Sequence, residues 1–136
     1  MSRFVLDCSV SAAWCLADES SEAAETILYR LASAEALVPP IWIAEMANVL
    51  LVAERKKRIT HADAARAVQV VMSLPIRIDS ADLRTLNAWR LLAREYDVSA
   101  YDASYLELAQ REGLPLATMD HALSLAARKC GVSVLP

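Results

Sequence analysis

The chain has 136 residues, 56% of them hydrophobic, and a formal net charge of −3 from 14 Lys and Arg against 17 Asp and Glu. This length fits one domain covering residues 1–136, and the hydrophobic share exceeds the roughly 45–50% of ordinary soluble proteins, which argues against disorder. The negative net charge argues against a protein that binds nucleic acid through overall positive charge. The presence of only two glycines excludes the glycine-rich loops that bind nucleotides.

No membrane or export signal is evident in the sequence. The longest apolar run, residues 39–53, contains Glu45 and falls short of the roughly 20 residues that a membrane span requires. The N-terminus, MSRFVLDCSV, lacks the apolar length of a signal peptide. The three cysteines, Cys8, Cys15 and Cys130, show no C-x-x-C spacing, so neither a disulfide framework nor a zinc site is indicated. We therefore expect a cytoplasmic protein with reduced thiols.

The spacing of apolar residues predicts strands that alternate with helices. Continuous apolar runs indicate strands buried on both faces, and intervals of three and four indicate helices with one buried face. In chain order the predicted elements are a strand at 4–6, helices at 11–18 and 21–33, a strand at 37–38, helices at 41–58 and 61–73, a strand at 76–79, helices at 80–95 and 99–112, a strand at 114–118, a helix at 120–129 and a strand at 132–135. This order predicts an α/β fold, a three-layer α/β/α sandwich with a five-stranded parallel sheet.

Acidic residues follow several of the predicted strands. Asp7 comes directly after the first strand, Asp120 comes two residues after the fourth, and Glu45 lies one to two turns into the helix after the second. These positions share one edge of a parallel sheet, where functional groups gather beyond the carboxyl ends of the strands. Asp102 lies one turn into a helix that precedes a strand, so its place relative to that edge does not follow from the order of elements.

Each acid also has a structural explanation. Asp7 and Asp120 are equally well explained as caps of the helices that follow them, and Asp102 as a first-turn residue favoured by the helix dipole. Glu45 is different, because it interrupts a helix of apolar residues together with Asn48, three positions later. Burying an unpaired carboxylate costs several kcal/mol. For Glu45 we therefore favour a functional role.

Converging carboxylates would raise the pKa of at least one of them unless a cation lies between them. Mg²⁺ or Mn²⁺ is the natural occupant, since both prefer oxygen ligands and neither needs a cluster of His or Cys. A metal held in this way is suited to phosphodiester hydrolysis, because it polarises the phosphate and activates a bound water. His61 and His121 are expected to lie on the surface.

Four blocks of the sequence, VLDCSV, IAEMANVL, AYDASYLELA and LPLATMDHAL, resemble the PIN-domain ribonucleases, and within them the VapC-type toxins of bacterial toxin–antitoxin pairs. The blocks occur in the family's order over essentially the whole length, which implies a single PIN domain at 1–136. The resemblance implies four metal-binding acids and three supporting polar residues: Asp7, Glu45, Asp102 and Asp120, with Ser9, Asn48 and Thr118. It further implies Mg²⁺- or Mn²⁺-dependent endonucleolytic cleavage of RNA, a homodimer, and inhibition by a cognate VapB-like antitoxin.

One position departs from the family pattern. Many relatives carry a further acid shortly after the position of Asp120, whereas His121, Ala122, Leu123 and Ser124 follow here, which leaves the number of metal ions open. A catalytically silent PIN-fold module that binds RNA or a protein is the alternative function. A metal-dependent phosphatase is disfavoured, because Ser9 stands where a second acid is expected.

Two other features have two explanations each, and a third concerns the oligomeric state. The basic cluster Arg55, Lys56, Lys57 and Arg58 is either favourable charge at a helix end or a contact for RNA phosphates. The aromatic residues Trp14, Trp42, Trp89 and Tyr101 are expected in the core more often than in base stacking. The apolar surface on the predicted helices at 42–53 and 61–72 predicts part of a homodimer interface.

Overall fold

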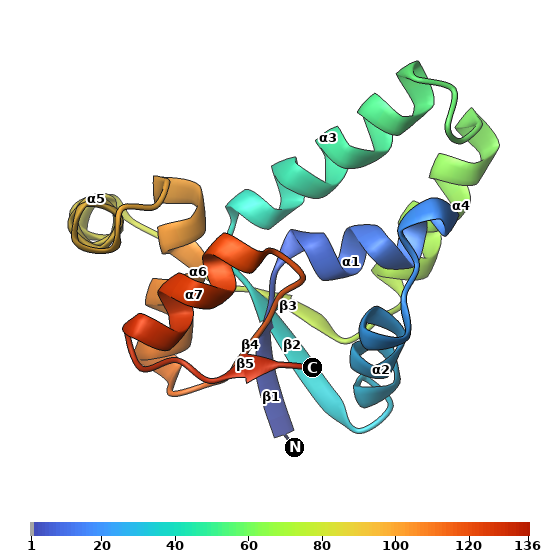
Figure 1. Ribbon diagram of the computed structural model, residues 1–136. Coiled ribbons are helices and arrows are strands. Elements are labelled where there is room, and N and C mark those ends of the chain that lie inside the picture. Colours follow the sequence, from blue (N-terminus) through green and yellow to red (C-terminus); the bar gives the residue numbers. More distant parts are fainter. Residues whose placement is uncertain (1) are drawn as a thin grey trace.

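The computed structural model describes residues 2–136 and contains five parallel strands between two layers of helices (Figure 1). The strands lie in the order β3-β2-β1-β4-β5, with β1 in the centre. Their bounds are β1 Ser2–Leu6, β2 Ala34–Val38, β3 Ile76–Ile78, β4 Leu116–Ala117 and β5 Val134–Leu135. The predicted three-layer sandwich with a five-stranded parallel sheet is confirmed.

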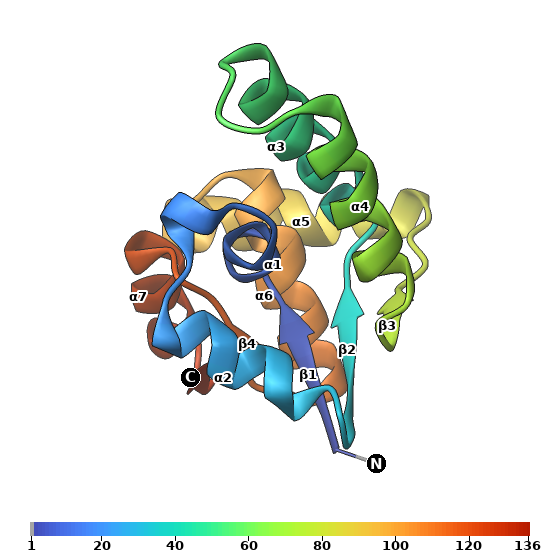
Figure 2. The ribbon, with the colours of Figure 1, turned by 90° about the vertical axis from the view of Figure 1, so that its right-hand side faces the viewer.

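Seven α-helices and a 3₁₀ helix connect the strands within residues 2–136. Their bounds are α1 Cys8–Cys15, the 3₁₀ helix Ala17–Glu19, α2 Glu22–Arg30, α3 Ile41–Arg55, α4 His61–Met72, α5 Leu83–Tyr96, α6 Ala100–Glu112 and α7 His121–Lys129. Figures 1 and 2 show α1 and α2 on one face of the sheet and α6 and α7 on the other, as right-handed crossovers require. In both views α3 and α4 form a helical hairpin that projects beyond the tips of β1 and β2.

Several predicted helix boundaries are wrong, including the ends predicted at residues 18 and 33, since α1 ends at Cys15 and α2 at Arg30. The helix predicted at 11–18 begins at Cys8, directly after Asp7, because the chain turns into α1 as soon as β1 ends. The helix predicted to reach residue 58 ends at Arg55, and Lys57 adopts a left-handed conformation with φ of 59°. The helix predicted from residue 80 begins later, because the side chain of Asp82 caps it by accepting a hydrogen bond from the Arg84 amide.

The core is centred on β1. Val5 pairs in register with Leu37 of β2 and with Leu116 of β4, and Phe4 and Val5 are completely buried. Such two-sided burial is what a continuous apolar run in a parallel sheet predicts. The cysteines are free thiols, and no helix within residues 2–136 is long and apolar enough to cross a membrane.

The aromatic residues divide between the core and the surface. Trp42 is buried, and its indole Nε1 donates a hydrogen bond to Ser11 Oγ at 3.0 Å, which holds α3 on α1. Trp14 and Trp89 are partly buried. Tyr101 is 63% exposed, so the expectation that it belongs to the core is wrong.

Apolar surface lies on three helices. In α3, Ile43 and Leu51 are exposed, and in α4, Val70 and Met72 are exposed, as the sequence predicts for these two helices. In α5, Leu83 is 87% exposed, which the sequence did not predict. The homodimer stays a prediction.

Candidate functional site

The candidate site lies where the sheet connections change direction. The strands β1 and β4 are neighbours, but the chain leaves β1 toward one face and β4 toward the other (Figures 1 and 2). Such switch points leave a crevice at the carboxyl ends of the strands. Asp7 follows β1, and its backbone amide donates to the carbonyl of Ala117 in β4 at 2.9 Å. The two strand ends are therefore joined at the crevice.

Asp7 is fixed by a network of hydroxyl groups. Its Oδ2 accepts hydrogen bonds from Ser9 Oγ at 2.6 Å and from Thr118 Oγ1 at 2.8 Å. Each hydroxyl is held in turn, since Ser9 Oγ accepts from the Met119 amide and Thr118 Oγ1 from the Asp120 amide. Both hydroxyl donors bind the same carboxylate oxygen, and within residues 2–136 no side chain donates to Oδ1 of Asp7.

The structure decides between capping and function differently for the two acids that follow strands. Asp7 stands at the N-cap position of α1, but its side chain makes no capping hydrogen bond, so that explanation is wrong. Asp120 does cap α7, with Oδ1 accepting from the Leu123 amide at 3.1 Å. A cap uses one oxygen, and the second oxygen of Asp120 is left for another role.

Glu45 reaches across the crevice from α3 to α6. Its Oε1 accepts a hydrogen bond from the hydroxyl of Tyr105, whose side chain is completely buried. Burial raises the pKa of Glu45, the Tyr105 hydrogen bond lowers it, and the negative charges of Asp7 and Asp102 raise it. The carboxylate that interrupts the apolar helix is thus bonded to a neutral hydroxyl and lies near two further acids.

Asp102 completes the group of acids. It lies in the first turn of α6, where its amide is capped by Ser99 Oγ at 3.0 Å. Burial and the charges of Asp120 and Asp7 raise the pKa of Asp102 to about 6. Burial also raises the pKa of Asp7, with a further contribution from Asp120. Since each acid acts on the ionisation of its neighbours, the structure brings Asp7, Glu45, Asp102 and Asp120 into one crevice.

No cation within residues 2–136 neutralises these four acids, since every ion pair of the described chain is made by other carboxylates. Nor do any three of the described acidic, His and Cys side chains already surround one point closely enough to hold a metal. Carboxylate oxygens are the donors that Mg²⁺ and Mn²⁺ prefer. By its chemistry the donor set therefore fits a divalent cation.

Family models match residues 4–129 of the chain to the PIN domain. The chain belongs to the PIN domain family. Comparison with curated protein sequences gives no match.

Solved structures show the same fold. PAE2754 from Pyrobaculum aerophilum has a TM-score of 0.75 at 23% identity and covers 98% of this chain and 89% of its own. VapC20 from Mycobacterium tuberculosis, a sarcin-ricin loop cleaving toxin, has a TM-score of 0.65 at 20% identity over 98% of this chain and 99% of its own. A toxin–antitoxin complex from Klebsiella pneumoniae has a TM-score of 0.66 at 14% identity over 98% and 96%. Likeness at these identities concerns the fold.

Other predicted site residues lie farther from the acids of this PIN domain. Asn48 is exposed on α3 and lies one turn beyond Glu45. Arg55, at the end of α3, stands about 15 Å along the helix from Glu45 at 1.5 Å per residue. Lys56 and Lys57 are exposed beyond it, and Arg58 forms ion pairs with Asp18 at 2.7 Å and with Glu19 at 2.8 Å. The structure does not bring this basic cluster to the crevice.

Sequence reasoning missed Tyr105. The signal was present in AYDASYLELA, because Tyr105 follows Asp102 by three positions and so shares its face of a helix. A tyrosine in an apolar helix resembles a core residue, however, and the partner of its hydroxyl lies 60 positions away. His61 and His121 are exposed, as predicted.

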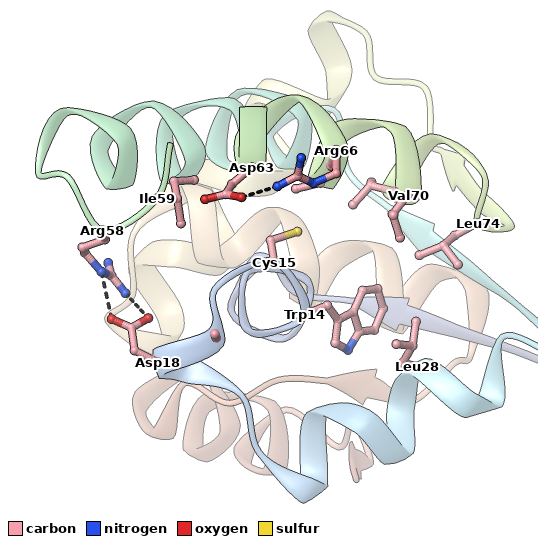
Figure 3. A pocket seen from close by; sticks show the side chains of 13 residues that line it. Trp14, Cys15, Asp18, Leu28, Arg58, Ile59, Asp63, Arg66, Val70 and Leu74 are labelled. Atoms are coloured by element: carbon pink, nitrogen blue, oxygen red, sulfur yellow. Dashed lines mark hydrogen bonds and ion pairs between the residues drawn. The ribbon is translucent and has the colours of Figure 1, made fainter. Parts of the chain in front are cut away.

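The PIN domain also contains a large groove between α4 and the pair α1 and α2 (Figure 3). The groove has a volume of about 710 Å³. Trp14 and Leu28 line it from one side, and Val70 and Leu74 from the other. On its rim, Arg58 is bonded to Asp18 and Arg66 to Asp63 (Figure 3). These rim charges are paired, and most of the groove's surface is apolar.

Proposed function

We propose that this PIN domain is a divalent-metal-dependent endoribonuclease, the toxin of a type II toxin–antitoxin pair. The observation that carries the proposal is that Asp7, Glu45, Asp102 and Asp120 lie close enough for their charges to act on one another's pKa, and that none of them forms an ion pair within the described chain. Four mutually repelling carboxylates destabilise the fold unless they bind something positive. A module that only binds RNA or protein has no need for them, which argues against the catalytically silent alternative.

The four acids would hold Mg²⁺ or Mn²⁺, with Ser9 and Thr118 supporting Asp7. When bound, the ion would polarise a phosphate oxygen and lower the pKa of a bound water. Ser9 and Thr118 hold Asp7 in one orientation, so little ordering is left to occur when a ligand arrives. Asp120 is held by its own cap on α7, which orients its second oxygen.

The partners of the proposed toxin follow from its surfaces. RNA is the proposed substrate, and Arg55, Lys56 and Lys57 at the tip of the α3–α4 hairpin are available to contact its phosphates. The apolar faces of α3 and α4 are proposed to contribute to a homodimer. The protein is proposed to act as one domain in the cytoplasm.

A cognate antitoxin is proposed to bind the groove between α1, α2 and α4. Its paired rim charges and apolar lining suit the apolar face of a partner segment rather than a charged one. Val70→Asp should abolish co-purification with the antitoxin. Gln69→Asp, which places the same charge at the exposed neighbouring position of α4, should not. Equal antitoxin binding by both variants would refute this assignment.

The nuclease proposal is tested with RNA and purified protein. Wild-type protein should cleave RNA internally in Mg²⁺ or Mn²⁺ and not in EDTA, and Asp102→Asn should abolish cleavage. Asp97→Asn is the matched control, because Asp97 is an exposed residue in the left-handed conformation at the end of α5, which Asn also adopts readily. Unchanged cleavage by Asp102→Asn would exclude the proposed metal site.

A further inference from the structure

The hydroxyl of Tyr105 belongs to a fully buried side chain, and a buried hydroxyl is unfavourable unless it is hydrogen-bonded. Tyr105 is completely buried between α6 and the sheet, and its immediate neighbour Leu106 is also fully buried. Phenylalanine would fill the same volume without a polar atom, and burying an unpaired hydroxyl costs about 1–3 kcal/mol. The buried hydroxyl is satisfied by donating to Glu45 Oε1. The hydrogen bond between Tyr105 and Glu45 is therefore part of the packed structure and not an incidental surface contact.

This contact connects the two elements that carry acids on opposite sides of the crevice. Glu45 comes from α3, in the projecting hairpin, and Asp102 comes from α6, one turn before Tyr105. A carboxylate on a long side chain has several rotamers to choose from, and fixing it loses conformational entropy. The Tyr105 hydroxyl restricts Glu45 to one of them. With Oε1 engaged, Oε2 is the oxygen that no side chain within residues 2–136 binds.

We infer that Tyr105 is a positioning residue that holds Glu45 in place as a ligand for the divalent metal. This inference rests on the proposed metal site. Tyr105 does not touch the reacting atoms. Its hydroxyl orients the carboxylate beforehand, so that the loss of the hydroxyl weakens metal binding although the ligands themselves are unchanged.

The test measures Mn²⁺ binding by titration calorimetry, without any RNA. Tyr105→Phe keeps the ring and removes only the hydroxyl, and it should raise the Kd for Mn²⁺ roughly 10-fold, as for other groups that orient metal ligands. Tyr96→Phe makes the same chemical change at the end of α5, away from the four acids, and should leave the Kd unchanged. Thermal unfolding in EDTA reports separately whether Tyr105→Phe has altered the fold.

A double-mutant cycle shows whether the hydroxyl acts through Glu45. In a Glu45→Gln background, Tyr105→Phe should have little further effect on the Kd, because the carboxylate that it orients is gone. An equal loss in both backgrounds would overturn the inference, as would an unfolded Tyr105→Phe protein. Tighter Mn²⁺ binding by Tyr105→Phe would also overturn it, since Tyr105 would then compete with the metal for Glu45.

The outcomes separate this inference from the proposed function. If Glu45→Gln weakens Mn²⁺ binding but Tyr105→Phe does not, the metal site stands and the role of Tyr105 is refuted. If wild-type protein does not bind Mn²⁺ at all, both the proposed function and the role of Tyr105 are refuted.

Discussion

The acids of this PIN domain that are paired with arginine and the acids in its crevice differ in what neutralises them. Outside the crevice, Arg111 bonds to Asp79 at 2.6 Å and to Glu107 at 2.8 Å, and Arg58 bonds to Asp18 at 2.7 Å. Asp18, Asp79 and Glu107 are therefore neutralised by arginines of the same chain. In the crevice, Asp7, Glu45 and Asp120 accept hydrogen bonds from hydroxyl and amide groups, and none of the four acids is paired with an arginine or lysine of the described chain.

The difference shows which charges serve stability and which are kept for a ligand. A hydrogen bond from a neutral hydroxyl orients a carboxylate but leaves its charge in place, whereas an arginine cancels it. Exposed ion pairs contribute little, typically about 0–1 kcal/mol each. We therefore expect that neutralising a crevice acid changes metal binding and cleavage, and that neutralising an acid paired with arginine changes stability slightly and leaves metal binding and cleavage unchanged.

The largest effect is expected from Asp7→Asn. Cleavage of RNA should fall by more than about 100-fold, since losing a group that only supports a metal ligand already lowers metal affinity or activity about 10–100-fold. Initial rates on a labelled RNA in saturating Mn²⁺ measure this. Asp18→Asn removes an acid that Arg58 neutralises and should cleave like wild type. Equal losses in both variants would contradict the distinction between the two groups of acids.

Metal binding should stabilise the fold itself. At Mn²⁺ concentrations of 100 times the Kd, the free energy of unfolding should rise by about 2.7 kcal/mol, because only the folded chain brings the four acids together. For a domain of this size that corresponds to roughly 10 °C in Tm. Thermal unfolding followed by circular dichroism, with and without EDTA, measures it. An equal gain in Asp7→Asn would show that the metal binds elsewhere.

The charge of Asp102 should make the metal-free protein sensitive to pH. Burial and the charges of Asp120 and Asp7 raise the pKa of Asp102 from 3.8 to about 6. A raised carboxyl pKa contributes stability that is fully present below 3.8 and lost as the pH rises through about 6. Asp102→Asn removes this loss and should make the metal-free protein more stable at pH 7 by about 1–2 kcal/mol, allowing for solvent screening.

Urea unfolding in EDTA between about pH 4 and pH 8 tests this prediction, because the ionisation of Asp102 changes the free energy of unfolding over roughly this pH range. The profile of Asp102→Asn should be flatter than that of wild type. Asp97→Asn is again the control and should follow the wild-type profile. A wild-type profile that rises across this range would contradict the direction predicted here.

The smallest effect is expected from Arg111→Gln. Its ion pairs with Asp79 and Glu107 are partly exposed, so their loss should cost about 1 kcal/mol or less in the free energy of unfolding. Because Arg111 lies away from the crevice acids, the Kd for Mn²⁺ should not change. A changed Kd would show that the surface ion pairs influence the crevice, which the comparison between the two groups of acids excludes.

Much of this molecule is determined by short-range patterns in its sequence. Continuous apolar runs and helical spacing determined the order of strands and helices, because burial against a sheet requires those periods. The rule for parallel sheets then placed Asp7, Asp120 and Glu45 at one edge from the sequence alone. Helix boundaries were less well determined, as at Asp82, because several residues near a helix start can cap it.

The tertiary structure decided what depends on distant contacts. It placed Asp102 in the crevice, where the order of elements had left its position open. It also decided that the Asp7 side chain binds Thr118, 111 positions away, instead of capping α1, and that Tyr105 binds Glu45. A local pattern shows that a side chain is polar or buried. Which partner satisfies it depends on the packing of segments far apart in the chain, and only the folded structure specifies that.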